Sequence, residues 1–199
     1  MISQEKFDKK FFNSGAYKNY RKILSAWVRP MARRISKTVG DRPSIKILDI
    51  GCGFGDLIAE LQNKYRFEVS GIDYSSYAVR KADPSIRKRI KKGSILDSAF
   101  KKNGFDAVVC FDVIYYLSPK EVDKAIKNLV DASRKYIFFN SIYRHSFDAS
   151  QRNNPDPLRN KVLSKKEYIS IFSKNGAKLV KSFREKNGGE TLVFKKVKK

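Results

Sequence analysis

The pattern of hydrophobic and polar positions along the chain predicts an alternation of strands and helices. Short apolar runs predict strands, and apolar side chains at three- and four-residue spacing predict helices. The expected strands are Ile45–Ile50, Phe67–Ile72, Arg89–Lys92, Phe105–Phe111, Tyr136–Asn140, Ala177–Arg184 and Thr191–Lys196. The expected helices are Gln4–Phe12, Tyr17–Lys37, Asp56–Lys64, Tyr77–Ala82, Pro119–Ser133 and one that runs from the capping box Ser164-Lys-Lys-Glu167 to about Lys174.

This alternation predicts a mostly parallel sheet with helices on both faces. Asn187-Gly-Gly189 is a hairpin signal between the last two strands. We therefore expect an α/β fold with a doubly wound, mostly parallel seven-stranded sheet that carries an antiparallel strand at its C-terminal end. The 199 residues suit a single domain with a full core.

A run of alternating glycines follows the first expected strand. Asp49 stands at the carboxyl end of that strand, and Gly51, Gly53 and Gly55 follow it. Such a strand, turn and helix start let backbone approach a ligand closely. The dinucleotide fingerprint G-x-G-x-x-G is not met, because Asp56 stands three residues after Gly53. A tight turn without a ligand would give the same glycines.

A second carboxylate makes a ligand site more specific. The next expected strand ends in Asp73, about 20 residues after the glycine turn. In open α/β sheets, this position accepts hydrogen bonds from a ribose diol. Two acidic strand ends therefore predict a ligand that carries a nucleoside.

Leu48-Asp-Ile-Gly-Cys-Gly-Phe-Gly55 and Gly71-Ile-Asp-Tyr-Ser75 together resemble the class I S-adenosylmethionine-dependent methyltransferases. Gly93-Ser-Ile-Leu-Asp97 resembles the segment that frames the adenine in that family, with Ser94 where an acidic residue is common. The resemblance implies S-adenosylmethionine as cofactor, and we expect no metal. The cofactor-binding residues that it implies are Asp49, Gly51, Cys52, Gly53, Asp73, Tyr74, Ser94, Ile95, Phe111 and Tyr20.

The segment Phe105–Pro119 resembles the fourth strand of this family and the loop that faces the substrate. An oxygen or nitrogen acceptor can need a general base. The loop after this strand offers Asp112, Tyr115 and Tyr116, and the loop after the fifth offers His145. We take His145 and Tyr115 as candidate catalytic residues, although a lone histidine in a polar loop is more often a surface residue.

The loop also bears on the acceptor. Asp112-Val-Ile-Tyr115 differs from the Asn/Asp-Pro-Pro-Tyr of amino-group enzymes and looks more like enzymes that methylate small molecules, sugars or lipids. Residues 143–163 are expected to form a substrate-side loop. Its basic residues, among them Arg144 and Arg159, suggest an anionic acceptor, although a solvated loop would carry them equally well.

The N-terminal segment Phe11–Tyr20 resembles an aromatic lead-in that folds over the cofactor in many small-molecule methyltransferases. We therefore expect residues 1–40 to form a helical lid, with Tyr17 or Tyr20 closing the pocket. Plain packing of these aromatic side chains onto the sheet is the alternative.

The charge of the chain adds another acceptor to consider. Forty-three Lys and Arg residues against 20 Asp and Glu give a net charge of +23. This excess favours nucleic acid or anionic surfaces, so RNA is the alternative methyl acceptor. A solvated lysine-rich surface explains the charge equally well. A cofactor-fold protein that binds RNA or a partner without catalysis is a third hypothesis.

Two cysteines and one histidine make an ordinary zinc site improbable. Free thiols fit a reducing compartment, and Cys52 suits packing better than nucleophilic chemistry. The sequence shows neither a membrane-spanning apolar run nor the apolar region of a signal peptide. We therefore expect a cytoplasmic protein, and the sequence leaves the oligomeric state open.

Overall fold

The computed structural model describes residues 2–14, 20–97, 100–143, 156–160, 163–184 and 189–197, with the backbone alone for residues 20–25. Seven strands follow the order β3-β2-β1-β4-β5-β7-β6. The fold is a mostly parallel α/β sheet with flanking helices, as expected from the sequence. The chain divides into two compact units, Ser3–Ser94 and a unit formed mainly by Ile95–Lys199, and each is described by itself.

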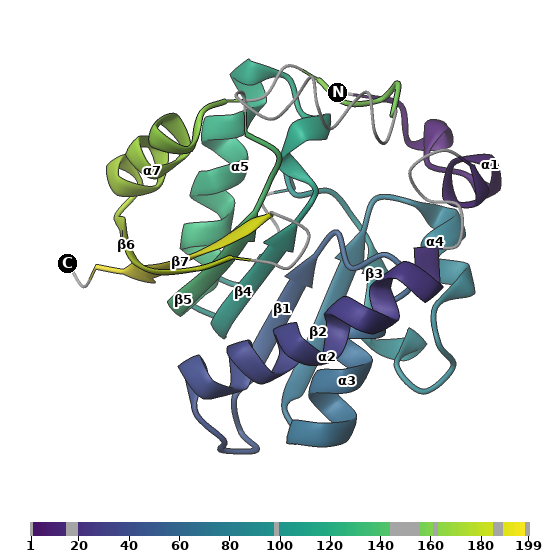
Figure 1. Cartoon of the computed structure of the whole chain (residues 1–199), viewed down its shortest axis with the longest axis horizontal. Helices are drawn as coiled ribbons and strands as arrows, with labels where there is room; N and C mark the ends of the chain where they lie inside the picture. Colours follow the sequence, from purple (N-terminus) through teal and green to yellow (C-terminus); the bar gives the residue numbers. More distant parts are fainter. Residues whose placement is uncertain are drawn as a thin grey trace. The chain divides into compact units, whose positions relative to one another are not determined.

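The unit Ser3–Ser94 is built on three parallel strands, β1 (Lys46–Ile50), β2 (Glu68–Asp73) and β3 (Ile90–Lys92). Its main helices are α2 (Tyr20–Val39), α3 (Asp56–Tyr65) and α4 (Ser76–Lys81), and α2 and α3 pack side by side (Figure 1). Apart from the N-terminal helix, the expected elements are therefore present here, with small differences at their ends. Pro30 lies inside α2 without ending it.

The N-terminal residues differ from the expected single helix. A 3-10 turn, η1 (Gln4–Lys6), is followed by a separate short helix, α1 (Lys9–Asn13). Asp8 separates them because its carboxylate accepts the Phe11 N–H at 2.9 Å and starts α1. A continuous helix over Gln4–Phe12 was therefore a wrong prediction.

The unit Ile95–Lys199 contains β4 (Phe105–Phe111), β5 (Ser133–Asn140), β6 (Ala177–Arg184) and β7 (Glu190–Lys196). β4 and β5 are parallel, whereas β7 runs antiparallel to both β5 and β6. The expected antiparallel strand is thus confirmed, and it lies between β5 and β6, so that β6 forms the edge.

Two helices pack on these strands: α5 (Pro119–Ala132) contacts β4 and β5, and α7 (Lys165–Lys174) contacts β6. The expected capping box of α7 is present: Ser164 N–H donates to Glu167 Oε2 at 2.8 Å. Phe172 of α7 is fully buried and stacks on Phe194 of β7, with ring centroids 3.8 Å apart. This contact fixes the helix on the sheet. Within the described residues, no helix combines the length and apolar character that crossing a membrane requires.

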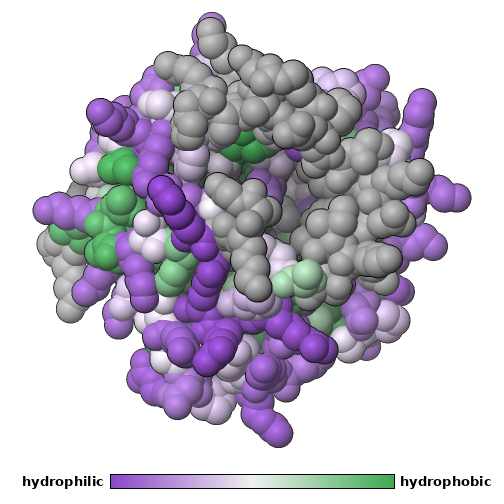
Figure 2. Space-filling model, viewed as in Figure 1, coloured by the Kyte–Doolittle hydropathy of each residue, from purple (hydrophilic) through white to green (hydrophobic). Residues whose placement is uncertain are grey.

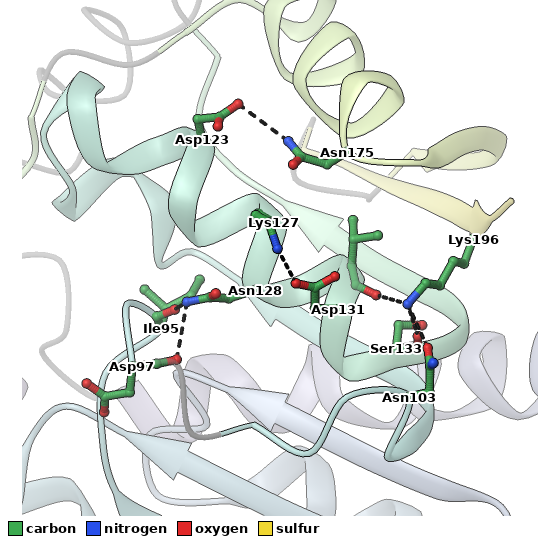
Figure 3. A network of polar contacts seen from close by, with 11 residues as sticks. Ile95, Asp97, Asn103, Asp123, Lys127, Asn128, Asp131, Ser133, Asn175 and Lys196 are labelled. Carbon is green, nitrogen blue, oxygen red and sulfur yellow. Dashed lines mark hydrogen bonds and ion pairs between the residues drawn. The ribbon is translucent and has the colours of Figure 1, made fainter. Parts of the chain in front are cut away.

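A polar network joins the end of β7 to neighbouring segments of the same unit (Figure 3). The Lys196 ammonium group donates to the carbonyl oxygens of Val130 and Ser133 and to Asn103 Oδ1, at 2.7 to 3.0 Å. Burial lowers the pKa of Lys196. Because three oxygens from different segments meet one ammonium group, Lys196 ties the last strand to the rest of the unit.

Candidate functional site

The glycine turn after β1 is fixed to the end of β2 by backbone hydrogen bonds. The N–H groups of Gly51 and Cys52 both donate to the Ile72 carbonyl oxygen, at 2.8 and 3.0 Å. Gly51 and Gly53 have φ of 78° and 56°, in the left-handed region where glycine is favoured. The glycines therefore hold the turn against the strand end that carries Asp73.

Asp73 is buried at the end of β2 and receives two backbone donors. Gly53 N–H donates to Oδ2 and Ser75 N–H to Oδ1, each at 2.7 Å. A carboxylate offers about four acceptor positions, so two remain for a ligand. The glycine turn and Asp73 are therefore joined by a direct hydrogen bond, and the carboxylate keeps acceptor positions for further donors.

Asp49, in β1, is the second buried carboxyl group of this region. Burial, with the charge of Asp73 as a smaller cause, raises the pKa of Asp49 to about 7. Burial raises the pKa of Asp73 to about 6, although the Ser75 and Gly53 N–H groups oppose the rise. Two acidic groups that titrate near neutrality favour a ligand with a positive charge or with hydrogen-bond donors.

Cys52 contributes packing at this turn. A β-carbon added at Gly71 of β2 would lie 2.7 Å from Cys52 Sγ, so the thiol fills the space that this glycine leaves. Burial raises the pKa of the Cys52 thiol well above its ordinary value, with Asp73 and Asp49 adding to the rise. A neutral thiol is a poor nucleophile, which agrees with the packing role expected from the sequence.

The N-terminal segment packs against both loops of this region. Phe12 is buried and lies 4.9 Å from Phe54 of the glycine turn, measured between ring centroids. Gln4 donates its side-chain amide to the Tyr74 carbonyl, and Ser75 donates its hydroxyl to the Phe7 carbonyl. These contacts anchor residues 4–12 beside the glycine turn and the residues that follow Asp73. Tyr17 and the side chain of Tyr20 lie outside the described residues.

The remaining expected cofactor residues occupy strand ends and loops. Tyr74 follows β2 and packs edge-on against Phe7, with centroids 6.0 Å apart. Ser94 is buried in the loop after β3, and Phe111 is the last residue of β4. Ile95 is buried, and its carbonyl oxygen accepts a hydrogen bond from the Asn128 side chain at 2.9 Å (Figure 3).

In the unit Ile95–Lys199, a second group of side chains gathers after β4. We call it the tyrosine–arginine cluster, and it consists of Asp112, Tyr115, Tyr116, Asp156 and Arg159. Tyr116 donates its hydroxyl to Asp156 Oδ2 at 2.7 Å, and Arg159 Nε lies 3.6 Å from the same oxygen. The Arg159 guanidinium carbon lies 5.3 Å from the centre of the Tyr115 ring. The cluster thus joins two loops that are about 40 residues apart in sequence.

Asn160 strengthens the same connection through the backbone. Its N–H donates to the Tyr115 carbonyl at 2.7 Å, and its side-chain amide donates to the Tyr116 carbonyl at 3.0 Å. Both tyrosines belong to the 3-10 turn η4 (Ile114–Tyr116). Residues 156–160 therefore hold η4 in place.

Asp112 is the exposed member of the cluster and has a positive φ of 57°. The surrounding protein displaces part of the water around its carboxyl group, and this desolvation raises the pKa. The charge of Arg159 and a hydrogen bond with Tyr115 oppose the rise. Because Asp112 is accessible to solvent, water attenuates the rise, in contrast to the buried Asp49. The result is an accessible carboxylate at a strand end, held by a neighbouring tyrosine.

The structure describes only some of the other residues that were expected to contact the methyl acceptor. Tyr115, expected as catalytic, is buried within the cluster. His145 and Arg144 lie outside the described residues, so the expected role of His145 stays a prediction. Tyr143 is buried, and its hydroxyl donates to the Glu190 carbonyl at 3.4 Å. Among the described residues, no group of acidic, histidine and cysteine side chains could hold a metal ion.

Two asparagines were not anticipated from the sequence. Asn128 holds the Ile95–Asp97 backbone from α5, and Asn160 holds η4. For Asn128 a weak signal existed, because its polar side chain interrupts the apolar face of a helix. Asn160 gave none, because asparagine is common in loops.

Comparisons with known proteins bear on both regions. Residues 47–135 match a family model described as a methyltransferase domain. The matched segment is slightly less than half of the chain. It begins in β1 and includes the glycine turn, Asp73 and the loop that carries Asp112.

Two curated proteins are similar to part of the chain. An uncharacterized protein of Rickettsia prowazekii is 32% identical over 111 residues, and the mitochondrial ubiquinone biosynthesis O-methyltransferase of Saccharomyces cerevisiae is 25% identical over 140 residues. The matches cover 50% and 63% of this chain and 44% of each relative, so the chain spans about half the length of these relatives.

Among solved structures, magnesium protoporphyrin IX methyltransferase from Synechocystis PCC 6803, with bound SAH, has a TM-score of 0.73 at 16% identity. That similarity covers 94% of this chain and 97% of the other, and it shows the shared fold. The matched family model and the shared fold are the basis of the function proposed below.

Proposed function

We propose that this protein transfers a methyl group from S-adenosylmethionine to an oxygen or nitrogen atom of a small acceptor, anionic or carbohydrate-like. The observation that carries the proposal is the buried Asp73, which the glycine turn holds through Gly53 while two acceptor positions stay available. The acceptor class follows from the loop after β4, which resembles that of enzymes acting on small molecules.

The residues around the glycine turn fit the proposed cofactor. Asp73 would accept the ribose hydroxyls, and the Gly51–Gly53 backbone would approach the cofactor closely. Asp49 adds a second carboxyl group near the turn, which favours a positively charged ligand. Ser94 and Ile95 would border the adenine, with Asn128 holding the Ile95 carbonyl.

The tyrosine–arginine cluster fits the handling of the acceptor. S-adenosylmethionine supplies an activated methyl group, so the protein has to orient the acceptor and take up its proton. Asp112 is the accessible carboxylate and would act as the general base. Tyr115 would orient Asp112 through its hydroxyl, and Arg159 would keep the carboxylate ionised by opposing the rise of its pKa.

RNA is the second candidate acceptor, and the net charge of +23 favours it. The yeast relative is named as acting in ubiquinone biosynthesis, and the Synechocystis structure is named for magnesium protoporphyrin IX. Both names support a small organic acceptor over RNA.

An acceptor screen with methyl-labelled S-adenosylmethionine tests the proposal. The wild-type protein is incubated with separate pools of small carboxylates, sugars, phosphorylated metabolites and total RNA, beside the Asp73→Asn variant. We expect label in a small-molecule pool with the wild type and at least about 100-fold less with the variant, since a charge-assisted contact to the ribose is lost. Calorimetry first establishes that the wild type binds S-adenosylmethionine.

The outcomes separate the parts of the proposal. Label found only in RNA would show that the acceptor class is wrong while methyl transfer stands. An absence of S-adenosylmethionine binding, with wild type and Asp73→Asn alike, would remove the methyltransferase function itself.

A further inference from the structure

A groove lined by cations lies between α2 and α3, within the unit Ser3–Ser94. It has a volume of about 470 Å³, and its walls are formed by Arg29, Pro30, Arg33, Arg34, Lys37 and Lys64. The lining residues are thus one proline and five cations, without an acidic side chain. Figures 1 and 2 show the molecule from the same side. α2 and α3 lie in the lower part of Figure 1, and the lower part of the surface in Figure 2 is mainly hydrophilic.

The spacing of the cations on α2 suits an extended anion. Arg29, Arg33 and Lys37 stand four residues apart, so they lie on one side of the helix. Successive members are displaced by about 6 Å along the axis, and the three together span about 12 Å. A single small anion would meet only one or two of them, whereas a chain of phosphates can contact all three.

Three of the cations that line the groove have no acidic partner among the described residues. Neither Arg29, Arg33 nor Lys37 forms an ion pair with another residue in the part of the chain that the structure describes. The sequence of α2 also contains no aspartate or glutamate. A concave surface with one sign of charge attracts counter-ions and polyanions.

The groove is separate from the glycine turn. α3 begins with Asp56 directly after the turn, and Lys64 lies eight residues further along this helix. Eight residues of helix correspond to about 12 Å. An anion held at Lys64 and α2 therefore need not compete with a ligand at Asp73.

We propose that the groove between α2 and α3 binds the phosphate backbone of a nucleic-acid strand, independently of which molecule accepts the methyl group. Arginine predominates among the lining cations, and its planar guanidinium group suits phosphate oxygens. A membrane surface fits less well, because interfacial helices insert large apolar side chains. In the described residues, the exposed large apolar side chains are Leu179, Val180 and Val197, all outside this groove.

Fluorescence anisotropy with a labelled single-stranded RNA of about 20 nucleotides tests the proposal. The groove variant carries Arg29→Gln, Arg33→Gln and Lys37→Gln. The matched control carries Lys120→Gln, Lys124→Gln and Lys178→Gln at exposed positions of the other unit. Each triple variant lowers the formal net charge from +23 to +20, and glutamine has a helix propensity close to those of arginine and lysine.

We expect the groove variant to bind RNA about 100-fold more weakly at 0.1 M salt, and its salt slope to fall by about 2, because about three phosphate contacts are lost. The control variant should stay within about threefold of the wild type. A single-stranded DNA of the same sequence should behave like the RNA, since the contacts go to phosphates. Asp73→Asn should leave RNA binding unchanged.

Two results would overturn the proposal. Equal weakening by both triple variants would show that net charge alone attracts RNA. Loss of binding to vesicles of phosphatidylserine and phosphatidylcholine in the groove variant, with RNA binding intact, would assign the groove to a membrane surface instead. Circular dichroism of both variants checks that α2 keeps its helical content.

Discussion

The two candidate regions hold their carboxyl groups in different ways. In Ser3–Ser94, Asp73 is held by backbone N–H groups from the glycine turn and from Ser75. In Ile95–Lys199, the side chains of Tyr116 and Arg159 contact Asp156 Oδ2, and one backbone group, the Leu158 N–H, donates to Oδ1. The carboxylate of the first region is therefore held by backbone groups alone, whereas the second region also depends on side chains, among them Tyr116 from a distant segment.

This difference determines which residue types each region requires and which it can exchange. Backbone donors approach Asp73 only if the turn keeps its positive φ values, so glycines are required there. Side-chain networks can be rebuilt with other residues as long as every polar group is satisfied. We infer that the first region suits a fixed cofactor and the second suits a variable acceptor.

The largest expected effect comes from adding one methyl group at Gly55. Its φ is 81°, and an added β-carbon would lie 2.4 Å from Ile86 Cδ1 and 2.7 Å from Ile90 Cδ1. Both isoleucines are buried, so they cannot move aside freely. We expect Gly55→Ala to lower the free energy of unfolding by about 3–5 kcal/mol, from backbone strain and overpacking together. Urea unfolding measures this.

Gly176 provides the matched control in the other unit. Its φ is 87°, but an added β-carbon would meet nothing within 4 Å. Gly176→Ala should therefore cost only the left-handed backbone strain, about 1–2 kcal/mol. If both variants lost the same free energy of unfolding, Ile86 and Ile90 would not restrict the space at Gly55.

The sequence predicted the first region well because its constraints are local. Alternating glycines between a strand and a helix require a tight turn, and the strand that ends in Asp73 is the next one along the chain. The strands of both units were also recognisable, since each is a short apolar run with turn residues beside it. The 3-10 turns and the break at Asp8 were missed because single capping contacts decide them.

The second region could be predicted only in part. Asp112, Tyr115 and Tyr116 were identified as candidates from their place after a strand. Their connection to Asp156 and Asn160 depends on how a separate loop folds back, about 40 residues later, and no periodicity encodes that. The pairing of polar side chains from distant segments could therefore not be predicted from this sequence.

Asp73→Asn tests whether the first region alone determines the affinity for S-adenosylmethionine. The variant replaces one carboxylate oxygen with an amide nitrogen, which would face the N–H group of Gly53 or Ser75 and lose that hydrogen bond. We expect S-adenosylmethionine affinity to fall about 100-fold, because a charge-assisted contact to the ribose is lost as well. Calorimetry measures the affinity. Asp123→Asn, at a solvent-exposed ion pair of the other unit, should leave it unchanged.

The same two carboxyl groups predict how stability depends on pH. Asp49 and Asp73 have pKa values of about 7 and about 6 in the folded protein, above the ordinary aspartate value. Between about pH 4 and 7 the folded state holds protons that the unfolded chain releases, so the free energy of unfolding falls as the pH rises. Asp49→Asn should reduce this fall by about 2 kcal/mol, as followed by urea unfolding across the window. Identical pH profiles would contradict the raised pKa of Asp49.

The smallest expected effect belongs to the side-chain network. Tyr116→Phe removes the hydroxyl that donates to Asp156, and the loop at residues 156–160 loses one of its ties to η4. We expect kcat/KM for the acceptor to fall about tenfold, the scale of one hydrogen bond to a charged group, with S-adenosylmethionine affinity within about twofold of wild type. Tyr136→Phe on β5 removes a hydroxyl elsewhere in the unit and should change neither value. If Tyr116→Phe weakened cofactor affinity as much as acceptor turnover, the division between a backbone-built cofactor region and a side-chain-built acceptor region would fail. A tenfold change confined to the acceptor would show that the network acts on the acceptor alone.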